Sequence, residues 1–131
     1  MARGKLYLVL AWLLVALSAL CAASSGDGLW MIRVPDKARV KQNPFAGDAR
    51  AVAAGAKLFG QNCAGCHGPD ANGQYDHPSL RTERIRAATP GELQWILTNG
   101  SMRNGMPSWS RLPEQQRWQI IAYLKSLPSK N

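Results

Sequence analysis

Two cysteines and a histidine form the segment Cys63-Ala64-Gly65-Cys66-His67, which has the spacing of a c-type haem attachment motif. Thiols three positions apart can add to the two vinyl groups on one edge of a porphyrin and form thioether bonds. The histidine that follows directly can then supply one axial ligand to the iron. The motif therefore predicts that Cys63 and Cys66 attach one haem c, that His67 ligates its iron, and that the protein transfers electrons.

The Cys-x-x-Cys spacing also occurs in thioredoxin-like redox sites and in zinc sites. A thioredoxin-like site follows a strand in a βαβ unit, whereas the Ala-rich stretch 49–61 before this motif favours a helix. A structural zinc site needs four ligands. After the motif, the chain has no further cysteine and one further histidine, His77. Haem attachment therefore fits the sequence better than either alternative.

A low-spin electron carrier needs a second axial ligand, and a methionine thioether commonly accompanies histidine in this role. Two methionines follow the motif, Met102 and Met106. Gly105 and Pro107 flank Met106, and a methionine in such a loop is poorly explained as core filler. We therefore predict that Met106 is the second ligand, with Met102 as the alternative. His77 could also ligate, but it fits better as an exposed loop residue.

The N-terminus has the pattern of an export signal. Arg3 and Lys5 precede an apolar run over 6–20, which small residues follow. The run is short for a membrane span, so we predict a signal peptide over 1–23. The alternatives are an uncleaved anchor, which would hold the protein at the membrane through residues 6–23, and lipidation at Cys21. Export to the bacterial periplasm suits haem c, because the haem is attached outside the cytoplasm.

The charge of the chain narrows the class of partner. Removal of Arg3 and Lys5 would lower the formal charge from +8 to +6, so the exported chain stays basic. Basic surfaces attract acidic proteins, anionic lipids or nucleic acids. Export argues against nucleic acid, and the basic residues are scattered rather than interleaved with aromatics. We predict redox protein partners with acidic docking surfaces, because charge attraction raises the rate of association more than the affinity. The alternative is that the positive charge serves only to keep the protein soluble.

Turn and capping signals divide the exported chain into an extended arm over 24–47 and an all-α domain over 48–131. Asp48 is a favourable N-cap for a first helix over 49–60. Gly55 lies inside this helix, where glycine costs about 1 kcal/mol relative to alanine. We expect close approach of another helix to offset that cost.

Two further helices follow a loop over 68–82. The capping-box residues Thr89, Pro90 and Glu92 predict the start of the second helix, and Asn99-Gly100 predicts its end. The last helix is predicted from Pro113 at its first position to about Leu127, and no segment has a convincing strand pattern.

From about residue 48 to the C-terminus, the chain resembles the class I cytochromes c in their small single-haem bacterial form. Four pieces carry the resemblance in the right order, namely 55–67, 77–80, 105–109 and 117–124. It implies the cytochrome c fold, with three to four helices and long loops around one covalently bound haem.

The resemblance also implies contacts at the haem and between helices. The Pro78 carbonyl would accept the proton of the His67 nitrogen that faces away from the iron. The last helix would cross the first and bring Tyr123 near Gly55 and Phe59. One or two of the arginines between Leu80 and Met106 would pair with the haem propionates; these are Arg81, Arg84, Arg86 and Arg103.

Together these features predict a periplasmic electron carrier rather than an enzyme, passing single electrons from a dehydrogenase or respiratory donor to an oxidase or other acceptor. One alternative is a haem-c subunit of a larger membrane-associated dehydrogenase or oxidase complex, in which the arm and an uncleaved N-terminus would matter. Another is a haem-based sensor or enzyme, which needs an open sixth position and a distal acid or base. Asp70 and Asp76 are the nearest acids and fit better as solvated loop residues.

Overall fold

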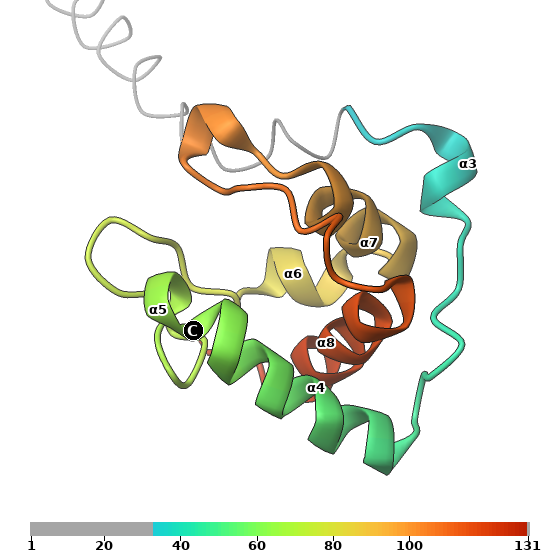
Figure 1. Cartoon of the computed structure of the whole chain (residues 1–131), viewed down its shortest axis with the longest axis horizontal. Helices are drawn as coiled ribbons and strands as arrows, with labels where there is room; N and C mark the ends of the chain where they lie inside the picture. Colours follow the sequence, from blue (N-terminus) through green and yellow to red (C-terminus); the bar gives the residue numbers. More distant parts are fainter. Residues whose placement is uncertain (1–32, 131) are drawn as a thin grey trace, which may run out of the picture.

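The computed structural model describes residues 33–130, and three longer helices form its frame (Figure 1). These are α4 (Ala49–Asn62), α7 (Pro90–Asn99) and α8 (Glu114–Ser126). Short helical pieces lie in the connections: α3 (Asp36–Arg39), α5 (Ala64–His67), α6 (Glu83–Ala87) and the 3-10 turn η1 (Met102–Asn104). Residues 33–130 form no strand beyond two isolated bridges, which confirms the all-α class. The signal peptide and the lipidation alternative at Cys21 fall outside the described residues.

Helix α4 begins as its sequence predicts and crosses α8 at a glycine. The Asp48 carboxylate accepts hydrogen bonds from the backbone N–H groups of residues 50 and 51, at 2.8 and 3.2 Å. A Cβ on Gly55 would lie 1.9 Å from the carbonyl oxygen of Gln119 in α8. The rings of Phe59 and Tyr123 lie 5.4 Å apart across the same crossing. The predicted contact between the first and last helices is therefore confirmed.

The other two helices differ little from prediction. In α7, Thr89 and Glu92 form both hydrogen bonds of the capping box, and Gly100 ends the helix with φ 71°. Pro113 is the N-cap of α8 rather than its first residue, so this helix begins one position later than predicted. It ends at Ser126, again within one residue of the prediction.

Two short helices were not predicted. The arm is not extended throughout, because α3 forms one helical turn within it and buries Ala38. Helix α6 follows the predicted loop, and the Thr82 hydroxyl caps it by accepting a hydrogen bond from the Ile85 N–H at 3.4 Å. Both helices are too short to show a hydrophobic periodicity in the sequence. Among residues 33–130, no helix combines the length and the apolar character needed to cross a membrane.

The core lies between α4, α7 and α8 and borders the site described next. Phe59, Ile120 and Ile121 have the largest fully buried side chains, each less than 2% exposed. Leu93 and Leu97 of α7 join the same cluster, and partly buried side chains that include Leu80 and Met106 pack against it.

Candidate cofactor site

A cavity of about 550 Å³ lies beside the core, within the range of roughly 300–1,000 Å³ that is usual for ligand and cofactor sites. All five residues predicted to contact the cofactor line it: Cys63, Cys66, His67, Pro78 and Met106. Much of the remaining wall is apolar and is built from Phe59, Leu80, Ile85, Leu93, Leu97, Ile120 and Leu124. In Figure 1, α5 and η1 approach the same side of the molecule from different directions. The site can therefore accept a large apolar group that carries a metal at its centre.

The turn α5 presents the attachment motif to the cavity. The backbone N–H groups of Cys66 and His67 both donate to the Cys63 carbonyl, at 3.1 and 2.9 Å. Both cysteines are free thiols; Cys63 is buried and Cys66 is exposed. Burial, with a smaller contribution from the charge of Cys66, raises the pKa of the Cys63 thiol to about 11. Cys63 is therefore a neutral thiol at pH 7, without the activated thiolate of a dithiol redox site.

The His67 ring is held by the predicted contact. Its Nδ1 atom lies 2.9 Å from the Pro78 carbonyl oxygen. A carbonyl only accepts hydrogen bonds, so Nδ1 carries a proton, and in the neutral form of the ring the lone pair lies on Nε2. Such an outer hydrogen bond orients a histidine and raises its basicity as a metal ligand. His67 thus has the tautomer that iron ligation through Nε2 requires.

The two methionines differ in their relation to the cavity. Met106 is partly buried and lines it, whereas Met102 is 73% exposed and is not among the lining residues. Both backbone polar groups of Met106 pair with Ser101, the N–H at 3.1 Å and the carbonyl oxygen at 2.8 Å. A thioether can therefore reach the cavity from residue 106 more directly than from residue 102.

His77 is closer to the site than its sequence context suggested. It lines the cavity, its side chain is 35% exposed, and its ring centroid lies 6.4 Å from that of His67. The breaker residues around it predicted a loop, but they carried no signal that the loop folds back beside His67. The zinc alternative needs four ligands, and no three His, Cys, Asp or Glu side chains group as a metal site within residues 33–130.

Of the four arginines considered as cofactor contacts, Arg84 is the one that lines the cavity. Arg81 donates from Nε to the carbonyl oxygen of Pro128 at 3.1 Å, and Arg86 pairs with Glu83 at 2.9 Å. Arg103 is an exposed residue of η1. A guanidinium at the cavity is suited to bind a carboxylate of the bound group.

Comparisons with known proteins identify the family of this chain. Residues 50–124 match a family model described as cytochrome c oxidase, cbb3-type, subunit III. Cytochrome c550 of Pseudomonas aeruginosa is 33% identical over 90 residues, which cover 66% of this chain and 62% of that protein. Cytochrome c6 of Bryopsis maxima is 34% identical over 74 residues, which cover 53% of this chain and 84% of that protein.

Two further relatives are longer than the region that aligns with this chain. The CcoP subunit of the cbb3-type cytochrome c oxidase of Rubrivivax gelatinosus is 36% identical over 86 residues, or 63% of this chain and 28% of the subunit. The crystal structure of cytochrome cL from Methylophaga aminisulfidivorans superposes with a TM-score of 0.60 at 27% identity, covering 66% of this chain and 59% of that one. The chain thus spans less than two thirds of the length of several relatives that it matches.

Proposed function

Because this chain belongs to the cytochrome c family, whose members carry covalently bound haem c, we propose that it transfers single electrons through one such haem. In this proposal, Cys63 and Cys66 form the thioether bonds, and His67 and Met106 are the axial ligands. The observation that carries the proposal is the convergence of these four side chains on one largely apolar cavity.

The haem, when bound, supplies an iron that changes between the ferric and ferrous states. The apolar wall excludes water, and a thioether ligand favours the ferrous state. The Pro78 carbonyl holds the His67 ring, and Ser101 holds both backbone polar groups of Met106. Because these bonds hold the His67 ring and the Met106 backbone, little rearrangement should accompany a change of oxidation state. We further propose that Arg84 binds a propionate, because it lines the cavity.

Exposed residues beside the cavity support transient docking of a redox protein. Tyr75 is 96% exposed next to lining residue Asp76, and Met102 is 73% exposed next to lining residue Ser101. Apolar groups of this kind, with the net positive charge of the chain, suit a partner with an acidic docking surface. We propose that the protein is exported to the periplasm, with the signal over 1–23, and acts there as a carrier between donor and acceptor proteins.

A second candidate function is a subunit of an oxidase complex. Its support is the description of the matching family and the similarity to CcoP. Fractionation decides between the two: a carrier is released with the periplasmic contents, whereas a subunit stays with the membranes and co-purifies with other chains. Size-exclusion chromatography of the native material gives the same distinction through its apparent mass.

The ligation is tested with periplasmically expressed protein. The ferric protein should show the weak far-red charge-transfer band of a thioether–iron bond, and Met106→Ala should abolish it while Met102→Ala retains it. Denaturing mass spectrometry should find one haem attached, and replacing both cysteines with serine should remove it. A wild-type spectrum that lacks the band and shows ready binding of carbon monoxide to the ferrous protein would refute the carrier proposal and favour the sensor alternative.

A further inference from the structure

The arm that precedes α4 is packed on the helical domain. In Figure 1 it runs down the right side of the molecule, away from α5 and η1. Val34, Ala38 and Asn43 are each less than 10% exposed, and the Asn43 side-chain amide donates to the Trp118 carbonyl oxygen of α8 at 2.9 Å. The family match begins at residue 50, so this arm lies outside the region shared with the family.

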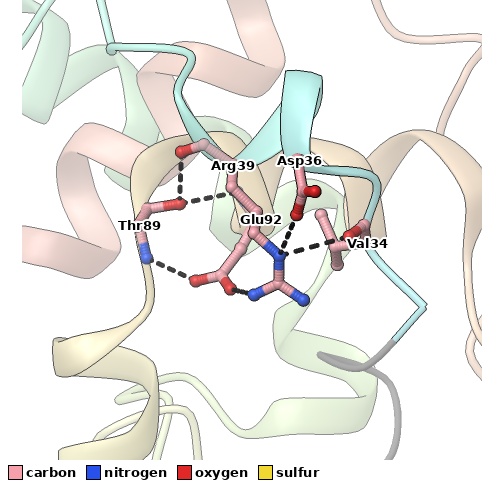
Figure 2. Close-up of polar contacts among 5 residues, drawn as sticks. All are labelled: Val34, Asp36, Arg39, Thr89 and Glu92. Atoms are coloured by element: carbon pink, nitrogen blue, oxygen red, sulfur yellow. Dashed lines mark hydrogen bonds and ion pairs between the residues drawn. The ribbon is translucent and has the colours of Figure 1, made fainter.

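One carboxylate joins the arm to the first turn of α7 (Figure 2). Glu92 has a side chain only 5% exposed and forms an ion pair with Arg39 of the arm. Its other oxygen accepts the Thr89 N–H at 2.7 Å, and the Thr89 hydroxyl donates to the Arg39 carbonyl at 2.9 Å. Arg39 also donates from Nε to the Val34 carbonyl at 3.2 Å. The helix cap and the arm therefore share one hydrogen-bonded network.

The backbones of the arm and α7 also touch directly. A Cβ on Gly91 would lie 1.8 Å from the Ala38 carbonyl oxygen and 3.1 Å from that of Lys41. No side-chain rotation could relieve such a contact, because the opposing atoms belong to the backbone. The arm can occupy this position only while residue 91 is glycine.

The segment over 101–109, called here the Met106 loop, follows the opposite end of α7. The Trp109 N–H donates to the Leu97 carbonyl at 2.8 Å, and the Ser108 hydroxyl donates to the Thr98 carbonyl at 2.6 Å. Ser101, which pairs with Met106, is the second residue after the end of the helix at Asn99. Helix α7 thus connects the arm at its N-terminus with the Met106 loop at its C-terminus.

We propose that arm residues 34–47 act as a strap that positions α7 and thereby keeps the Met106 loop closed over the cavity. Arg39 and Glu92 are positioning residues in this device. Loss of the ion pair leaves a buried carboxylate without its partner and loosens the first turn of α7. Opening of the Met106 loop then becomes more frequent, and external ligands reach the cavity more easily. This inference rests on the proposed His67/Met106 ligation.

Two variants of the haem-loaded protein test the strap. Gly91→Ala displaces the arm but improves the helix propensity of α7, and Arg39→Gln removes the ion pair. The matched control is Arg50→Gln, since the Arg50 side chain is 96% exposed and lies 3.9 Å from Asp48 at the start of α4. Arg39→Lys keeps the positive charge and should rescue part of the effect.

The first measurement is imidazole binding to the ferric protein. Imidazole can bind iron only when the Met106 loop opens, so its apparent affinity follows the open fraction. We expect about tenfold tighter binding in Gly91→Ala and Arg39→Gln, and unchanged binding in Arg50→Gln. The second measurement is amide hydrogen exchange, which should accelerate by about tenfold over 97–109 and change little over 50–62.

The outcomes separate the two proposals. The strap would be overturned by equal imidazole affinity in all variants, or by equal acceleration of exchange over 97–109 and 50–62. In either case the arm would have no specific effect on the Met106 loop. A wild-type protein without the thioether band would overturn the proposed ligation instead. In that case the hydrogen-exchange comparison alone decides whether the arm controls the loop.

Discussion

Replacing Gly55 with alanine tests the helix crossing on which the fold depends. The added Cβ would lie 1.9 Å from the Gln119 carbonyl oxygen, 2.6 Å from the carbonyl carbon and 3.0 Å from the Cβ of Tyr123. The first two atoms are backbone, so a rotamer change cannot relieve the overlap. An ordinary contact begins at 3.4 Å, and α4 and α8 would have to separate by about 1.5 Å at this point.

The expected loss in the free energy of unfolding is the difference between two opposing contributions. Overpacking a core usually costs about 1–3 kcal/mol, and a backbone overlap belongs near the upper end. Alanine in place of glycine gains about 1 kcal/mol of helix propensity. The net expectation is a loss of about 2 kcal/mol in the free energy of unfolding. Separation of the helices would also loosen Phe59, which is 1% exposed between them.

The assay is equilibrium unfolding of the haem-loaded protein in guanidinium chloride, followed by far-ultraviolet circular dichroism. The matched control is Gly60→Ala in the same helix, where a Cβ would meet no atom within 4 Å. That variant should be more stable than wild type by up to about 1 kcal/mol. If Gly55→Ala were as stable as Gly60→Ala, the close crossing would be wrong.

Three further substitutions probe the arm, a partly buried cation and the cavity. Asn43→Ala removes two hydrogen bonds at 2.9 Å, one to α8 and one within the arm, and should lower the free energy of unfolding by about 1–3 kcal/mol. Asn99→Ala, which alters an exposed residue, should cost less than about 0.5 kcal/mol; equal costs would contradict the anchoring role. Burial, with the charge of Arg86, lowers the pKa of Lys125. At a pH between the lowered pKa and the ordinary pKa of about 10.5, the unfolded chain therefore binds more protons than the folded chain. Over that window, a rising pH should stabilise wild type relative to Lys125→Met. A difference that is independent of pH would refute this. Arg84→Gln should make the midpoint potential of the haem more negative, on the order of tens of millivolts, because a nearby positive charge favours the reduced form. Voltammetry of Arg84→Gln beside Arg86→Gln measures this, and equal potentials would place Arg84 away from the propionates.

The proposed carrier and the proposed strap concern different parts of the chain. The cavity and the proposed ligands lie within the region that matches the family model, whereas Arg39 and the rest of the arm precede it. Relatives without such an arm could therefore keep the same haem ligation and differ in how easily the methionine loop opens. Comparing imidazole affinity across such relatives would extend the test beyond single substitutions.

The sequence by itself determined the features that depend on neighbouring residues. The attachment motif follows from the spacing of Cys63 and Cys66, and the start of α7 follows from Thr89 and Glu92, three positions apart. Gly55 indicated a close helix contact because glycine is otherwise unfavourable inside a helix. These signals act over one or two helical turns, so residues that are close together in the chain are enough to produce them.

Only the tertiary structure decided the features that join distant segments. Arg39 and Glu92 are separated by 53 positions, and neither carries a local signal for the other. The position of His77 beside His67, and the different exposures of Met102 and Met106, likewise depend on how the loops fold back on the core. Such contacts form only when packing of α4, α7 and α8 brings the segments together, and one sequence contains no local period that encodes that packing.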